Sequence, residues 1–402
     1  MVMRIKRIAF ILVIVTLLSK FIGFFRDVIL ANYYGASAIS DAYIIALTIP
    51  GVIFAFIGVS ISTSFIPIYT NIFKNEGLQP ADKFLNNLIS IFFILCTFIV
   101  IIVTIFTEQF VKVFAFGFDK DTLEMAIYFT RISVYSIYFS MMTHIYSAYL
   151  NIKEDFLTPA LMGIPFNIIL IGSIIVGANT SEIILPIGIL FSIATQFLFI
   201  KLALNRRKYR YKFNINLKDR HLKEIIVLSL PVILGVSVNQ INILVDRSIA
   251  SYISVGGISM VNYSSKLNDF ILGLFVLSLL SIVFPKMANY SSDGKMIELK
   301  KLLLDFLKSI NLILIPLIFF IVFFSYQIVS VIYGRGAFDE NAVTSTSQLL
   351  KFYMLGLIAV AYREVITKVF FSLKDTKTPT INAIIGLTVN IILNIEIPPT
   401  DM

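Results

Sequence analysis

The chain has 402 residues, of which 58% are hydrophobic and 14% are charged, and its formal net charge is +9. A composition this apolar excludes a soluble globular protein and predicts an all-α polytopic membrane protein. A single cysteine, Cys96, excludes a disulfide framework, and two distant histidines, His144 and His221, give no basis for a metal site.

Apolar runs of roughly 20 residues, the length that spans a bilayer, recur along the chain and predict about eleven helices. Their approximate ranges are 8–31, 39–70, 84–106, 123–150, 158–177, 182–203, 223–252, 258–288, 302–326, 342–372 and 378–394. Kinks or helix boundaries are expected at Pro50, Pro165, Pro231 and Pro316.

The connections between these runs alternate in charge. One alternate set, which includes the N-terminus, holds more than half of the 33 Lys and Arg residues, whereas the other set holds few. The positive-inside rule therefore predicts a cytoplasmic N-terminus. The basic stretch 201–223 then becomes a cytoplasmic linker that we expect to lie on anionic lipid headgroups. We expect no nucleic-acid partner, because no folded reader domain accompanies it.

Short motifs recur after about 220 residues. The paired positions are Phe118-Asp119 with Phe338-Asp339, Asp155 with Asp375, Asp27 with Asp246, and Pro67 with Pro285. The motif NIIL also occurs twice, at 167–170 and at 390–393, and this pair is shifted by three positions from the others. An even number of helices separates the copies, so both insert the same way up. The pattern predicts two parallel, pseudo-repeated helical lobes around a central cavity.

The repeat also predicts the domain boundaries. We expect an N-lobe at 1–203, a basic linker at 204–222, a C-lobe at 223–394 and a tail at 395–402. The C-lobe has about five predicted helices against about six in the N-lobe. Because the tail contains two adjacent prolines and cannot form a twelfth helix, we expect a C-terminal truncation.

The first predicted helix carries charges at bilayer depth, where each costs from about 2.5 to above 10 kcal/mol. Lys20, Gly23 and Asp27 fall on one helical face, and Arg26 borders it. One hypothesis is an internal ion pair with Lys20 snorkelling to the interface. The other is a cavity for an anion, which the excess of positive charge favours. The planar fork of arginine suits a diphosphate.

Polar residues in later helices leave two interpretations each. Asp41 either caps the second helix or lines the cavity. Asn239, Asn242 and Asp246, which share a helical face, either form a satisfied network or hold a coupling ion. His144 is interpreted as a hydrogen-bonded interior group rather than a proton relay.

The second predicted lobe carries further candidates. Lys266 and Asp269 lie on one helical face and are predicted to line the cavity. Arg363 either pairs with Glu364 or lines the cavity. No arrangement of polar residues supplies a nucleophile with a base, and no catalytic residue is predicted, so the chain is not expected to be an enzyme.

Several segments together resemble one family. The stretch SKFIGFFRDVILANYYGASAISDAYIIALTIP resembles the first two helices of the MurJ (MviN) lipid II flippases, which belong to the MOP superfamily of fourteen-helix exporters. The resemblance extends to FIPIYTN, YSSKLNDFILGLF, YGRGAFDENAV and FFSLKDTKTPT. It covers nearly the whole chain, and it implies that the helices after the eleventh are absent here.

The resemblance implies that Arg26, Asp27 and Asp41 match cavity residues of the family. Lys20 and Lys266 stand where the family has arginine, which keeps the charge but weakens bidentate phosphate binding. Where many relatives have an Arg-Arg pair in the second helix, this chain has Phe54 and Ala55.

The implied function is movement of the diphosphate–sugar head group of lipid II from the cytoplasmic to the outer leaflet of the bacterial inner membrane, by alternating access. It needs no cofactor, and Na⁺, H⁺ or the membrane potential would drive it. We expect a monomer in the bilayer that works beside the cell-wall synthesis complex. The alternatives are another MOP carrier, such as an oligosaccharide-lipid flippase or a multidrug antiporter, and a truncated product without transport activity.

Overall fold

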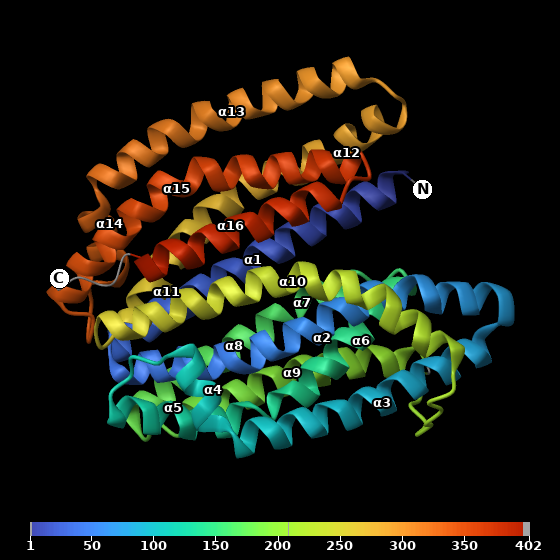
Figure 1. Cartoon of the computed structure of the whole chain (residues 1–402), viewed down its shortest axis with the longest axis horizontal. Coiled ribbons are helices and arrows are strands. Elements are labelled where there is room, and N and C mark those ends of the chain that lie inside the picture. Colours follow the sequence, from blue (N-terminus) through green and yellow to red (C-terminus); the bar gives the residue numbers. More distant parts are fainter. Residues whose placement is uncertain (1, 208, 397–402) are drawn as a thin grey trace. The chain divides into compact units, whose positions relative to one another are not determined.

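The computed structural model describes the backbone of residues 2–207 and 209–396, and their side chains except at 2–10, 57, 59–63, 231, 234 and 394–396. These residues form helices joined by short connections, with no strand among them (Figure 1). The all-α prediction is confirmed. The chain divides into two compact units, of which the first comprises residues up to Leu30 and Ala38–Val255, and the second Ala31–Ser37 and residues from Gly256 onward.

In the first unit, α2 is the central helix and packs against α3, α5, α6 and α10. Its side chains Tyr43, Ile45, Ile49 and Phe65 are almost completely buried. The helices are α1 (Val2–Tyr34, ending in the second unit), α2 (Ala38–Glu76), α3 (Leu78–Ile105), α4 (Thr107–Phe114), α5 (Lys120–Ser133), α6 (Ser136–Ile152), α7 (Leu157–Leu161), α8 (Gly163–Asn179), α9 (Ile184–Arg206) and α10 (Arg220–Ile253).

In the second unit, the long helix α15 occupies the centre and packs against α11, α12, α13 and α14. Leu350, Met354, Leu357 and Ala361 form its buried stripe at helical spacing. The elements are α11 (Gly257–Leu272), the π-helical turn η1 (Gly273–Leu277), α12 (Ser278–Ser292), α13 (Met296–Phe323), α14 (Ser325–Tyr333), α15 (Glu340–Ser372) and α16 (Lys377–Glu396).

Each predicted apolar run contains a helix, but four runs are interrupted: 123–150 by a turn, 158–177 by a short break, 258–288 by η1 and 302–326 by a turn at Phe324. The short helices α4 and α14 were not predicted. Among the described residues, six helices are apolar and long enough to cross a membrane, or seven if the two parts of α10, bent by 54° between Leu230 and Gly235, count as one span. Pro231, a predicted kink position, falls in that bend.

The two copies of the sequence repeat share local geometry. Asp119 and Asp339 both cap a helix by accepting a backbone N–H, from Thr122 and Ala342 respectively. Glu154 and Lys374 both have a positive φ, of 61° and 62°. The lobe boundaries remain predictions, and six residues of the predicted tail, 397–402, lie outside the described part of the chain.

The caps that follow the positive-φ residues also match. Asp155 accepts the N–H of Thr158, and Asp375 accepts that of Thr378. The Thr378 hydroxyl donates to Asp375 as well. These hydrogen bonds from Thr378 hold the pKa of the Asp375 carboxyl below its ordinary value.

The basic linker is bound along α3 by a series of hydrogen bonds. Tyr209 donates its hydroxyl to Asn86 Oδ1 at 2.7 Å, the Asn216 N–H donates to Asn87 Oδ1 at 2.7 Å, and the Tyr211 hydroxyl lies 2.7 Å from that of Ser90. Burial raises the pKa of the Tyr209 phenol, which keeps it a donor. The linker therefore lies along α3 and is called the strap from here on.

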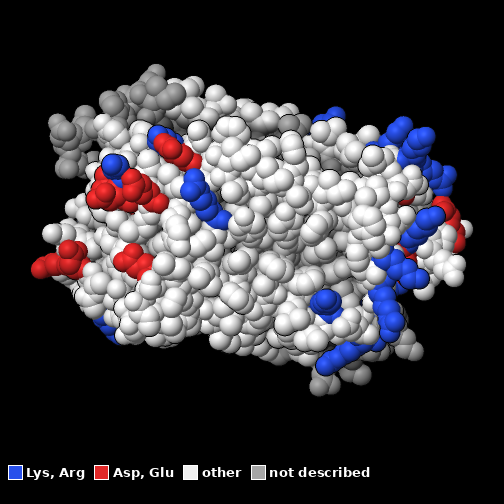
Figure 2. Space-filling view, turned by 90° about the horizontal axis from the view of Figure 1, so that it is seen from below, with Lys and Arg blue, Asp and Glu red and all other residues white. Residues whose placement is uncertain are grey.

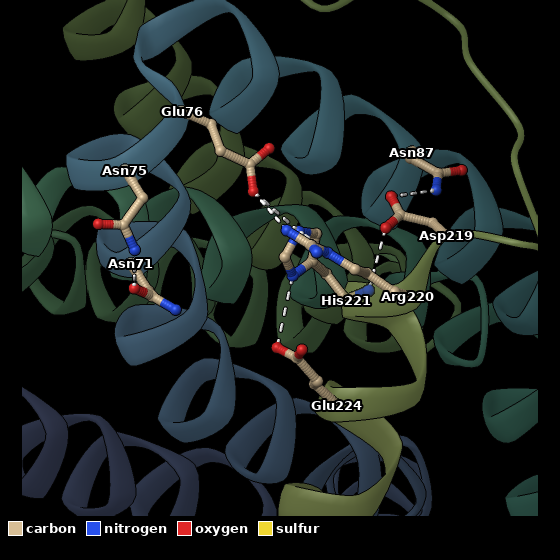
Figure 3. Close-up of polar contacts among 8 residues, drawn as sticks. All are labelled: Asn71, Asn75, Glu76, Asn87, Asp219, Arg220, His221 and Glu224. Atoms are coloured by element: carbon tan, nitrogen blue, oxygen red, sulfur yellow. Dashed lines mark hydrogen bonds and ion pairs between the residues drawn. The ribbon is translucent and has the colours of Figure 1, made fainter.

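The strap ends in a charged cluster at the start of α10 (Figure 3). Arg220 Nη2 lies 2.7 Å from Glu76 Oε1 at the end of α2, and His221 Nε2 lies 3.7 Å from the same oxygen. The other ring nitrogen of His221 lies 3.4 Å from Glu224, and Asp219 accepts from Asn87. The cluster joins the ends of α2, the strap and α10.

The second unit encloses the last turn of α1. The Ala337 N–H donates to Asn32 O at 2.8 Å, and the Tyr263 hydroxyl donates to Gly35 O at 3.1 Å. Gly336 has φ +62°, and a Cβ there would collide with the carbonyl of Asn32. This close backbone approach requires glycine at position 336.

We predict that Gly336→Ala destabilises the protein by at least about 2 kcal/mol, because it adds a backbone collision to the strain of a positive φ. Gly294→Ala is the matched control, since Gly294 has φ +71° but open space around its would-be Cβ. It should cost only roughly 1 kcal/mol. Unfolding of the purified variants in detergent measures both values, and equal losses would contradict the packing argument.

Candidate functional site

The Arg26 guanidinium lies between a carboxylate and an amide. Its Nε and Nη2 donate to Asp27 Oδ1 at 3.0 and 2.7 Å, and Nη1 donates to Asn167 Oδ1 of α8 at 3.3 Å. The Arg26 side chain is 15% exposed and that of Asp27 is 4% exposed. The ion pair compensates the charge of Arg26, and Asn167 is a partner that the sequence did not reveal.

Small residues bring α1 close to α8 at this point. A Cβ on Gly163 would collide with the Ser19 hydroxyl, and a Cβ on Gly23 would lie 3.5 Å from the Asn167 amide. Asn167 is itself fixed, because its Nδ2 donates to Gly163 O at 2.8 Å. Gly23, which the sequence placed on the charged face of the first helix, therefore forms a packing contact that sets the position of Asn167 opposite Arg26.

The predicted stripe of charge does not share one environment. Asp27 is buried, whereas Lys20 is exposed and has no ion pair among the described residues. Of the two cations of α1 whose side chains the structure describes, Lys20 is the one without an ion pair. Asp41 is 1% exposed in the first turn of α2, where its carboxylate lies near the positive end of the helix dipole.

The predicted ion-coupling group of α10 is only partly assembled. Asn242 Nδ2 donates to Asp246 Oδ2 at 3.3 Å, and both residues are half-buried. Asn239 is exposed. Among the described residues no cluster of His, Cys, Asp and Glu has the arrangement of a metal site.

The remaining candidates lie in the second unit. Lys266 of α11 is half-buried and Asp269 is exposed. Arg363 of α15 donates to Glu364 at 3.0 Å, and its side chain is 70% exposed. The ion pair expected between Arg363 and Glu364 is thus present, and its place in a cavity stays a prediction.

A pocket of about 310 Å³ lies within the first unit, between α2, α6, α8 and α9. His144 of α6 lines it, with its ring 4.9 Å from that of Phe54. No described residue forms a hydrogen bond with His144, and its expected role as a hydrogen-bonded interior group stays a prediction. The pocket was not predicted from the sequence, although Ser136, Ser140 and His144 recur at every fourth residue.

The fold and the charged helix face define a multi-pass membrane transporter of the MOP type. A MATE multidrug transporter of the MOP superfamily, in an inward-facing conformation, superimposes with a TM-score of 0.74 over 94% of this chain and 88% of its own, at 15% identity. A lipid II flippase MurJ in an inward closed conformation gives a TM-score of 0.86 at 31% identity, over 96% of this chain and 81% of its own.

Sequence comparison identifies the family. The family described as "Lipid II flippase MurJ" matches residues 30–400. A probable lipid II flippase MurJ of Buchnera aphidicola subsp. Baizongia pistaciae is 30% identical over 95% of this chain and 76% of its own length. One of Treponema pallidum is 26% identical over 94% of this chain and 74% of its own.

The chain belongs to the lipid II flippase MurJ family. It is a transporter and not an enzyme, and it is a multi-pass protein of the inner membrane. The resemblance drawn from the sequence motifs is confirmed.

We predict that Asp27→Asn lowers the free energy of unfolding by about 3 kcal/mol, because it leaves the buried Arg26 guanidinium without a counter-charge. Lys20→Ala removes an exposed charge and should change it by less than about 0.5 kcal/mol. Denaturation of both variants in the same detergent tests this. An Asp27→Asn protein as stable as the parent would contradict the ion-pair account.

Proposed function

We propose that this chain carries the diphosphate–sugar head group of lipid II across the membrane by alternating access, with Arg26 as the residue that first holds the diphosphate. The observation that supports this role is the buried Arg26 guanidinium, with two of its nitrogens on Asp27 and one on a neutral amide. Family membership supplies the substrate class.

The contacts of Arg26 suggest how an anion would enter. The ion pair with Asp27 keeps the guanidinium in place in an apolar setting. The 3.3 Å hydrogen bond from Nη1 to Asn167 is the longest of the three and joins a charge to a neutral group. A phosphate oxygen would replace Asn167 there and gain a stronger, charge-assisted bond while Asp27 stays paired.

Further cations complete the proposed path. Lys20, exposed and unpaired among the described residues, would attract the head group before Arg26 binds it. Lys266, Asp269 and Arg363 would line the cavity from the proposed C-lobe, 223–394. The N-lobe, 1–203, would then rock against it so that the cavity opens outward.

The driving force is proposed on electrostatic grounds. Moving one positive charge across the field changes its energy by about 2.3 kcal/mol per 100 mV, so a cationic site couples to the membrane potential. Asp246 with Asn242 offers oxygen ligands on α10 for Na⁺ or a site for H⁺, and Asn239 would join them. The protein would act as a monomer beside the cell-wall synthesis complex.

The proposed orientation places the N-terminus and the strap in the cytoplasm. On the face shown in Figure 2, Lys and Arg side chains gather toward one end, and a broad uncharged band separates them from charges at the other end. The strap carries basic residues and also exposes Phe213 and Leu217, each 74% accessible. This combination suits the headgroup region of an anionic leaflet.

We predict that Arg26→Ala lowers the rate of lipid II movement in proteoliposomes at least about tenfold, because a charge-assisted contact to the diphosphate is lost. Arg26→Lys, which keeps the charge without the planar fork, should give an intermediate rate. Arg131→Ala, the same truncation at an exposed position of α5, should leave the rate unchanged. Rates are compared per folded protein, and full activity of Arg26→Ala would refute the assignment.

We predict that a cysteine at the exposed position 217 reacts with a membrane-impermeant maleimide only after permeabilisation of the cells. A cysteine at the exposed Asp121, at the start of α5, should react in intact spheroplasts. The background is Cys96→Ala, which removes the buried native thiol. The opposite labelling pattern would reverse the proposed orientation.

A further inference from the structure

The pocket in the first unit has a wall of polar side chains. Ser136, Ser140 and His144 fall at i, i+4 and i+8 on one face of α6, and Gln196 of α9 joins them. None of the four side chains forms a hydrogen bond with a described residue, and Ser136 is fully buried. Polar groups in an apolar helix bundle are costly without partners, so this wall has unused capacity for a ligand.

The rest of the lining is apolar. Phe54 and Leu47 of α2 and Phe166 of α8 contribute to it, and none of the lining residues is Lys, Arg, Asp or Glu. Gly51 opens the wall further, because a Cβ at that position would meet nothing within 4 Å. A pocket without charge that is lined by aromatic rings together with hydroxyl, imidazole and amide groups does not suit a diphosphate. It suits a neutral ring with one apolar face and hydroxyl or amide groups at its edge.

One helix, α8, contributes to both the pocket and the Arg26 site. Phe166 lines the pocket, and the next residue, Asn167, accepts the hydrogen bond from Arg26. In the arrangement proposed below, a head group whose phosphate displaced Asn167 from Arg26 would place its neighbouring sugar in the pocket. The volume of about 310 Å³ falls at the lower end of the range for small-molecule sites and can hold one sugar ring.

We propose that this pocket binds an uncharged N-acylated sugar of the lipid-linked head group, with Gln196 and His144 contacting the acylamide and hydroxyl groups and Phe54 beneath the ring. The assignment of the sugar to a transported substrate rests on the proposed function. The binding of a neutral sugar does not depend on it.

The test measures binding of methyl N-acetyl-β-D-glucosaminide to the purified full chain in lipid nanodiscs by saturation-transfer NMR, with inorganic pyrophosphate as the anion probe. Gly51→Leu fills the pocket, and Gln196→Leu removes its amide. Each should raise the dissociation constant for the glycoside about tenfold or more. Gly172→Leu is the matched control, because Gly172 also has open space around its would-be Cβ but does not line the pocket.

Pyrophosphate binding should be unchanged in all three variants, which also shows that each variant is folded. Absence of saturable glycoside binding by the parent chain, or equal binding by Gly51→Leu and Gln196→Leu, would overturn the proposal. A parent chain that binds the glycoside at this pocket but moves no lipid II would instead refute the proposed function and leave the sugar site standing.

Discussion

The cost of a charge in hydrocarbon is the constraint on which the described site depends. Arg26 can lie inside an apolar helix bundle because the adjacent Asp27 neutralises it at 2.7 Å. In the proposed mechanism this pair is retained while other contacts of Arg26 change. The close approach of α1 to α8, made possible by Gly23 and Gly163, then places the neutral Asn167 beside Arg26. Replacing this hydrogen bond to a neutral amide should cost less free energy than breaking the ion pair with Asp27.

The same helix connects the two units. Residues of α1 up to Leu30 belong to the first unit, and its last turn, with Asn32 and Gly35 held by hydrogen bonds, belongs to the second. Five residues of continuous helix separate Arg26 from Asn32. Any shift of the second unit that displaces Asn32 therefore acts on the segment that holds Arg26. In the proposed mechanism this links head-group capture to the rocking of the lobes.

The sequence predicted features that depend on local patterns. The apolar runs predicted the long helices. The repeated motifs paired Asp119 with Asp339, and in the structure each of these residues caps a helix. The short helices α4 and α14 were not predicted, because eight or nine residues are too few to show a clear helical periodicity of apolar side chains. The position of the strap on α3 was not predicted either, because its basic residues dominate the sequence pattern. In the structure, Asn86, Asn87 and Ser90 of α3 instead bind the backbone and the tyrosines of the strap.

For the candidate site, the sequence predicted which residues are charged, but it did not predict which residues contact one another. The charge of Arg26 on an apolar helix marked it at once. Its contact with Asn167, 141 residues away, depends on packing of α1 on α8. The pocket was missed because Ser140, His144 and Gln196 are unremarkable one by one, and only the fold shows that they share a cavity without satisfying one another.

The central claim is that Arg26 binds the diphosphate of the substrate, and that Asp27 stabilises the charge of Arg26 inside the protein. The most direct measurement compares stability and lipid II movement for the double variant Arg26→Gln/Asp27→Asn with those of each single variant. Removing both charges should restore the free energy of unfolding to within about 1 kcal/mol of the parent, because no buried charge is left unpaired. Transport should remain at least about tenfold reduced. A double variant that moves lipid II at the parental rate would contradict the account, since the pair would then be only a packing element.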